Sequence, residues 1–315
     1  MSYRIRESGE TVILSVLIGA DQSLIGLKVK NSKIISIKFG ELDNIVHETY
    51  GIAEKNRFLN SVLDHYRTPR VPGRVLNLSD CDLVVLETVC ESPSDYFATD
   101  MVLRALKLYN GADIYSCYSI NYRFENGRIC YGGLGETVKY RHAIGFIEPH
   151  YALTEEKKTT FPEWYSTVFI KTFQTDCNES YRAMVNRYDI SYMIGICEAE
   201  YVMLFTILET LFGNDLTKIT SNIAKGTSKL LGVSSKDKGN IRNQMYRLYD
   251  VRSRYVHDGN NVPQESLFEL REIVRRVLVE ICNRGYHTKD KDWNELRDIL
   301  LPVASQTAEE TEKDE

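Results

Sequence analysis

The spacing of hydrophobic and polar residues changes character near residue 150. Before that point, the apolar runs are short and strand-like, as in the stretches 11–18 and 81–90. Two alternating runs lie between these stretches, one at Ile25, Leu27 and Val29 and one at Ile35, Ile37 and Phe39. A polar turn at Asn31 and Ser32 separates the two runs, so the pattern predicts two further strands.

The first half also predicts two helices and a hairpin. The helices cover 44–67 and 92–110, and the hairpin covers 113–133. Asn126 and Gly127 suit the tight turn of a hairpin, and aromatic-rich runs lie on both sides of them. We therefore predict a mixed domain of helices and strands over 1–150.

The second half is helical in pattern. We predict helices near 162–173, 178–187, 190–212, 217–231, 240–257, 263–283 and 292–300. The stretch 190–212 is long and apolar enough to suggest a membrane span, but Glu198 and Glu200 lie in its middle, where a bilayer would penalise them strongly. We interpret it as the central helix of a soluble bundle.

The whole chain is therefore predicted to be an α+β protein, with a mixed domain followed by an all-α bundle. The character of the sequence changes at about Tyr151, just before the polar segment "ALTEEKKTTFPEW", so we place the bundle at 151–300. The acidic stretch 301–315 has few residues able to pack, and we expect a disordered tail.

Composition narrows the class of protein. A net charge of −5 over 315 residues argues against nucleic-acid affinity spread over the whole surface, although a local basic site remains compatible with it. The seven cysteines have no C-x-x-C spacing, which favours reduced thiols in a cytoplasmic protein and speaks against a structural metal site. The motifs predict neither a metal nor a cofactor.

The most basic long stretch runs from 236 to 254. It contains Lys236, Lys238, Arg242, Arg247, Arg252 and Arg254, opposed only by Asp237 and Asp250. A phosphate-bearing partner such as RNA would bind here, but a solvated helix face has the same composition.

Arg252 occupies an unexpected place on this helix. Ile241, Met245 and Leu248 mark the buried stripe, and Arg252 and Tyr255 continue it. Because a buried guanidinium needs a partner, we expect either an internal carboxylate or an anionic ligand. Glu209 in "ILETLF" is the preferred carboxylate, with Glu198 and Glu200 as alternatives.

His257 lies five residues after Arg252, so the two side chains diverge by roughly 140° on a continuous helix. Either the helix ends at His257, before Asp258 and Gly259, or a second subunit completes the site. The structural alternative is that His257 only stabilises the helix C-terminus.

The second half resembles a HEPN domain of the Apea-like group. The resemblance covers 151–285 and rests on "LETLF" at the end of an apolar helix, then "LYDVRSRYVHDG", then an amphipathic helix. HEPN domains carry the signature R-x(4–6)-H, and His257 is the one histidine here with an arginine at that spacing. The position after the motif arginine is often Asn, Asp or His in the family, whereas here it is Ser253.

The resemblance implies a metal-independent endoribonuclease acting as a homodimer, in phage defence or as a toxin with a neutralising or regulatory partner. His257 would act as general base or acid, and Arg252 would bind the scissile phosphate. Ser253 would have a supporting role, Arg254 would bind a neighbouring phosphate or be solvated, and Tyr255 would stack on a base or pack. The alternative is a non-catalytic HEPN module that binds RNA or a nucleotide and dimerises.

Overall fold

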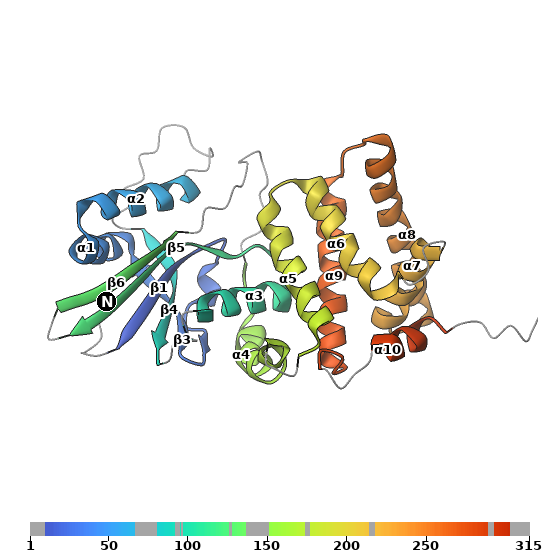
Figure 1. The fold of residues 1–315 in the computed structure, drawn as a ribbon, viewed down its shortest axis with the longest axis horizontal. Coiled ribbons are helices and arrows are strands. Elements are labelled where there is room, and N and C mark those ends of the chain that lie inside the picture. The colour runs from blue at the N-terminus through green and yellow to red at the C-terminus, as the bar shows by residue number, and fades with distance from the viewer. Residues whose placement is uncertain are drawn as a thin grey trace, which may run out of the picture. The chain divides into compact units, whose positions relative to one another are not determined.

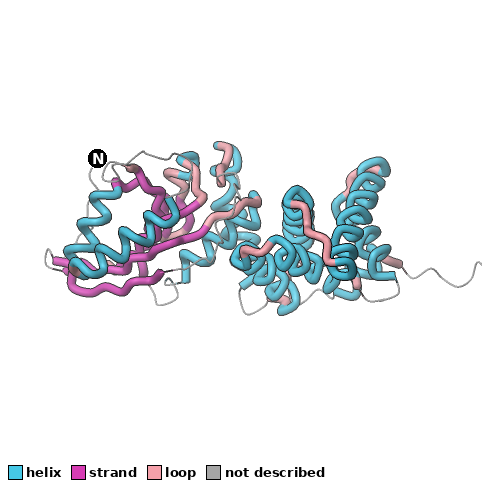
Figure 2. The backbone as a smooth tube through the Cα atoms, turned by 90° about the horizontal axis from the view of Figure 1, so that it is seen from above, coloured by secondary structure: helices cyan, strands magenta, loops and turns pink. Residues whose placement is uncertain are grey.

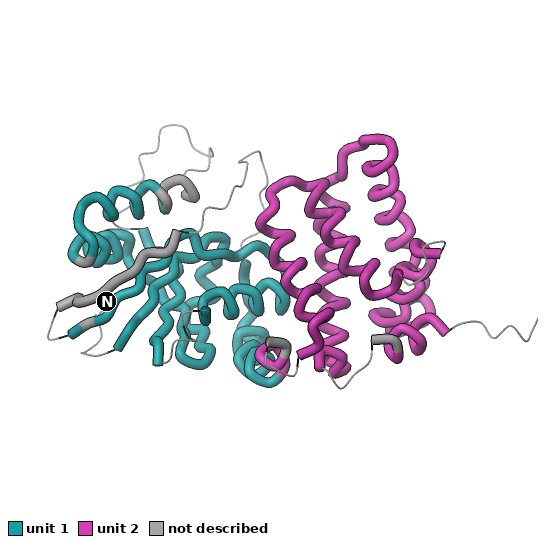
Figure 3. Tube along the Cα trace, in the orientation of Figure 1, with its two compact units in different colours: residues 1–167 teal, residues 168–315 magenta. Residues whose placement is uncertain are grey.

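The chain forms two compact units, which divide between Thr167 and Val168 (Figure 3). This computed structural model describes residues 10–66, 81–91, 95, 97–125, 128–136, 151–173, 177–213, 218–288 and 293–302. The first unit combines an antiparallel sheet with helices, and the second is helical. The α+β class predicted from the sequence is therefore confirmed.

The first unit is built on a six-stranded sheet in the order β2-β3-β4-β1-β5-β6. All described strand pairs are antiparallel. The strands are β1 (Thr11–Ile18), β2 (Lys28–Val29), β3 (Ser32–Lys38), β4 (Asp82–Cys90), β5 (Tyr115–Glu125) and β6 (Arg128–Glu136). The helices of this unit are α1 (Phe39–Tyr50), α2 (Ile52–Tyr66), α3 (Ala98–Asn110) and α4 (Glu155–Trp164).

Strand β1 lies at the centre of the sheet and is buried on both faces, which explains its continuous apolar sequence. On one face, Val12 and Leu14 belong to the core formed with α1 and α2 (Figure 1). On the other face, the hydroxyl of Ser15 lies 3.2 Å from that of Thr99 on α3 and 2.8 Å from that of Ser119 on β5. The buried hydroxyls satisfy one another, as burial of polar groups requires.

The region predicted as one helix over 44–67 consists of two helices. Gly51 lies between α1 and α2 with a φ of 84°, a conformation that a residue with a side chain adopts only with strain. Phe39, expected on a strand, begins α1 instead. Helix α3 begins at Ala98, later than predicted. The hairpin strands β5 and β6 are present, while Asn126 and Gly127 lie outside the described residues.

The segment after residue 150 packs with the sheet of the first unit, although its polar sequence predicts that it begins the bundle. The N–H of Tyr151 donates to Gly19 O at 2.6 Å, and its hydroxyl donates to Leu106 O on α3 at 2.6 Å. Phe161 on α4 packs edge-on against Tyr109 at 5.1 Å. Helix α4 begins at Glu155, earlier than predicted, because Thr154 caps it.

The second unit is a bundle of six described helices, seen from two directions in Figures 1 and 2. They are α5 (Glu179–Ile194), α6 (Cys197–Phe212), α7 (Ile219–Leu231), α8 (Ser235–Asp258), α9 (Gln264–Asn283) and α10 (Trp293–Leu300). Helix α9 buries the predicted apolar stripe, including Leu270, Val274 and Ile281. The hydroxyl of Tyr181 on α5 donates to Leu278 O on α9 at 2.9 Å, which fixes these two helices together.

The predicted central helix over 190–212 is wrong in its first part. The break falls at Gly195, which adopts a left-handed conformation, so α5 extends to Ile194 and α6 begins at Cys197. Glu198 and Glu200 therefore lie in the first turn of α6 rather than in the middle of a helix. Among the helices that the structure describes, none has both the length and the apolarity to cross a membrane.

Candidate functional site

Helix α8 carries the motif residues and is capped at both ends. The hydroxyl of Ser234 accepts from the N–H of Asp237 at 3.1 Å, and the Asp237 carboxylate accepts from the N–H of Val233 at 3.1 Å. This reciprocal arrangement starts the helix five residues before the predicted position. At the other end, Gly259 is left-handed with a φ of 70° and its N–H donates to Tyr255 O at 3.1 Å. One continuous helix thus contains both Arg252 and His257.

Arg252 lies on the buried side of α8 and meets the carboxylate preferred from the sequence. Its Nη2 lies 2.8 Å from Oε1 of Glu209 on α6, with each side chain 21% exposed. The N–H does not point directly at this oxygen, so the contact is an ion pair rather than an aligned hydrogen bond. The guanidinium also lies over the ring of Tyr249, 5.3 Å from its centroid. Arg252 therefore links the two helices.

His257 lies on a different face of the same helix. It is exposed in the last turn, one residue before α8 ends at Asp258. Because His257 follows Arg252 by five residues on the helix, the two side chains diverge by about 140° and are offset by about 7.5 Å along the axis. Within one chain, the structure does not bring His257 and Arg252 onto one surface.

The supporting residues divide between the two sides of the helix. Ser253 and Tyr255 are half-buried, whereas Arg254 is exposed. Arg254 pairs with Asp250 one turn earlier, at 2.7 Å. Because Arg254 precedes His257 by three residues, these two side chains share the exposed face.

The basic residues of the first half of α8 differ in how far they are neutralised. Arg247 pairs with Glu269 on α9, which also accepts from Gln244. Lys236, Lys238 and Arg242 are exposed, and within the described part of the chain no carboxylate pairs with them. Arg242 lies 6.0 Å from the ring centroid of Tyr246. The side chains of Lys236, Arg242, Arg254 and His257 lie on the solvent side of α8 and are called the basic face below.

A second ion pair, which the sequence does not predict, lies deeper in the bundle. Arg271 on α9 pairs with Glu200 on α6, and both side chains are less than 9% exposed. The other carboxylate oxygen of Glu200 accepts from the N–H of Gly195 at 2.9 Å, and Arg271 lies 4.5 Å from the ring centroid of Tyr192. Glu200 is therefore not the partner of Arg252. Arg271 could have been found from its place four residues after Leu267, on the apolar stripe of α9.

No family model matches the chain, and neither a curated protein nor a solved structure matches it significantly. Among the described residues, no three His, Cys, Asp or Glu side chains come together in a group able to hold an ion. The six cysteines whose side chains the structure describes are free thiols.

Proposed function

We propose that the protein is a metal-independent endoribonuclease of the HEPN type, acting as a dimer. The observation that carries this proposal is the placement of His257 on the basic face of α8, while Arg252 of the same motif is held by Glu209 on α6. His257 is exposed on a helix face that also carries Lys236 and Arg242, whose charges no described carboxylate offsets. Such a face is suited to a polyanionic substrate, because each cation that meets a phosphate adds salt-dependent affinity.

The divergence of Arg252 and His257 supports a shared site. In the proposed mechanism, His257 accepts the proton of a ribose 2′-hydroxyl or donates one to the leaving 5′-oxygen. The attacking 2′-oxygen forms a bond to phosphorus while the bond to the 5′-oxygen breaks, and a guanidinium neutralises the developing charge. Pairing two copies through the motif region would bring Arg252 of one chain closer to His257 of the other.

A second function, a non-catalytic RNA-binding module, is favoured by one specific observation. The guanidinium of Arg252 is already occupied by Glu209 and Tyr249, and the side chain is only 21% exposed. In that case Arg252 would hold α8 against α6, and the basic face would bind RNA without cleaving it. The two functions differ in whether bound RNA is cut.

The experiment compares cleavage of a labelled RNA by the full chain and by His257→Ala, with and without EDTA. The proposal predicts cleavage in both buffers and a loss of roughly 10²-fold or more in His257→Ala, which is the usual contribution of a general acid or base. His47→Ala is the matched control, because His47 is also an exposed histidine in the last turn of a helix. It should cleave like the natural chain.

RNA binding without cleavage by the natural chain would favour the binding module. Cleavage that EDTA abolishes, or that His257→Ala retains, would exclude the proposed mechanism. The mass of the protein in solution tests the dimer independently, since a strict monomer has no shared cleft. Slower growth of cells expressing the natural chain, relieved by His257→Ala, would support a toxin-like role.

A further inference from the structure

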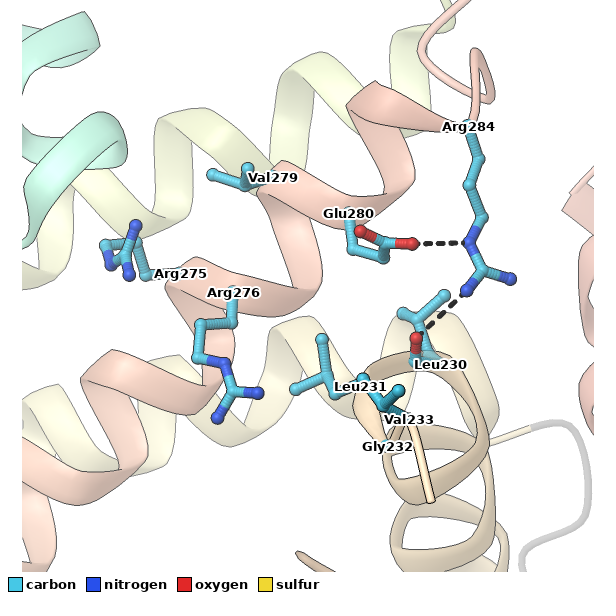
Figure 4. Close-up of a pocket in the computed structure, with 9 residues that line it drawn as sticks. All are labelled: Leu230, Leu231, Gly232, Val233, Arg275, Arg276, Val279, Glu280 and Arg284. Carbon is cyan, nitrogen blue, oxygen red and sulfur yellow. Dashed lines mark hydrogen bonds and ion pairs between the residues drawn. The ribbon is translucent and has the colours of Figure 1, made fainter. Parts of the chain in front are cut away.

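A cavity of about 410 Å³ lies in the second unit, between the C-terminal end of α7 and the second half of α9 (Figure 4). This volume lies in the range of small-molecule sites. Leu231 and Val279 form part of the apolar wall, and Val233 on the rim is 93% exposed. An apolar side chain with so little cover has no packing role, and it would gain contact from a ligand in the cavity.

The cavity is also cationic, since three arginines of α9 and the turn after it line it together with a single carboxylate, Glu280. Arg275 is engaged by Glu272, to which it donates two hydrogen bonds of 2.7 and 2.6 Å. Arg284 donates to Glu280 at 2.7 Å and to Leu230 O at 3.0 Å. Both of these arginines are therefore held in place by the protein.

Arg276 differs from the two other arginines. It is exposed, and among the described residues no carboxylate pairs with it. Figure 4 shows its side chain extending from α9 toward Leu231, across the cavity. The guanidinium of Arg276 therefore offers its donors to a ligand, whereas the charges of Arg275 and Arg284 are offset by their carboxylate partners.

We propose that this cavity binds a small phosphorylated molecule with an apolar or planar part, such as a nucleoside phosphate. The guanidinium of Arg276 would donate to phosphate oxygens in its fork geometry, and Leu231, Val233 and Val279 would contact the remaining part. The cavity adjoins the start of α8, whereas His257 lies at its end, about 30 Å away along the helix. The site is therefore separate from the proposed ribonuclease centre and independent of it.

Titration calorimetry on the full chain at fixed ionic strength tests this site. The probes are pyrophosphate and ADP, with adenosine lacking the phosphate and citrate as a non-phosphate anion. We expect ADP to bind more tightly than either comparison ligand. Arg276→Gln should weaken ADP binding roughly tenfold or more, because it removes charge-assisted hydrogen bonds.

Two further variants keep the result interpretable. Val233→Glu adds a negative charge at the rim without disturbing packing, and it should also weaken ADP binding. Arg182→Gln removes a partly exposed arginine of α5, outside the cavity, and should leave binding unchanged. The inference is overturned by absence of ADP and pyrophosphate binding at millimolar concentration, by equal binding of citrate, or by equal affinities of Arg276→Gln and Arg182→Gln. Arg276-dependent binding to RNA fragments alone would also overturn it.

Discussion

Arg252 lies 2.8 Å from Glu209, and this ion pair joins α8 to α6 at the point where α8 leaves the core. After Leu248 no residue of α8 is fully buried. The same helix carries a second ion pair at nearly the same distance, Arg254 with Asp250 at 2.7 Å. The two pairs differ in exposure, since the Arg252 pair is 21% exposed at each side chain and the Arg254 pair is 54% and 61% exposed.

This difference predicts unequal coupling energies. A double-mutant cycle with Arg252→Gln and Glu209→Gln should give a coupling of about 1 kcal/mol in the free energy of unfolding, because the pair is largely shielded from water. The matched cycle with Arg254→Gln and Asp250→Asn should give less than about 0.5 kcal/mol. Urea unfolding followed by circular dichroism measures both, and equal couplings would contradict the assigned role of Arg252 in joining the helices.

The buried pair of Arg271 and Glu200 should matter more for stability. Replacing Glu200 by Gln removes the carboxylate charge beside a buried guanidinium and should cost about 3–5 kcal/mol. The double variant Glu200→Met, Arg271→Met should cost less than the single change, because no buried charge remains. Chemical denaturation of the natural chain, the single variant and the double variant compares their free energies of unfolding. A double variant that is less stable than Glu200→Gln would show that the charges themselves stabilise the bundle.

Gly226 on α7 and Gly239 on α8 should respond oppositely to alanine. A Cβ at Gly226 would lie 2.4 Å from the ring of Phe212, whereas a Cβ at Gly239 would meet nothing within 4 Å. Gly226→Ala should therefore destabilise the bundle by about 1–3 kcal/mol through overpacking. Gly239→Ala should stabilise it by up to about 1 kcal/mol through helix propensity. Thermal melting of the two variants tests this prediction. A change of the melting temperature in the same direction for both variants would be inconsistent with this packing.

His287 should make the stability of the bundle depend on pH. Burial lowers the pKa of His287 below its ordinary value of 6.5, assisted by the charge of Lys171, although a hydrogen bond to Cys282 O acts in the other direction. In the unfolded chain the imidazole of His287 binds a proton near pH 6.5, whereas in the folded chain it binds that proton only at lower pH. The stabilisation is therefore present above pH 6.5 and is lost as the pH falls below it.

Urea unfolding between pH 7.5 and 5.0 measures this effect. His287→Asn should reduce the change in the free energy of unfolding with pH. Asparagine keeps a donor near the position of Nδ1, but it does not titrate. His47→Asn, which changes an exposed histidine, should retain the slope of the natural chain. If His287→Asn retains that slope as well, the acid sensitivity arises from another group.

The order and class of the elements could be predicted because they depend on local patterns. The apolar run of β1 and the stripe of α9 are visible in the sequence, since each reflects burial with a fixed period. The helix breaks were harder to place. Gly51 and Gly195 interrupt stretches in which the apolar pattern continues on both sides. The pattern therefore predicts a single helix over 44–67, and it places the boundary between α5 and α6 too early.

The sequence by itself determined that Arg252 needed an anionic partner, because its position on the stripe of α8 follows from helix geometry. It also determined that Arg252 and His257 diverge. Only the tertiary structure decided which carboxylate meets Arg252 and which meets Arg271, since Glu209 and Glu200 lie on the same helix and differ in which neighbour packs against them. Such pairings join residues far apart in the chain, and local periodicity carries no information about them.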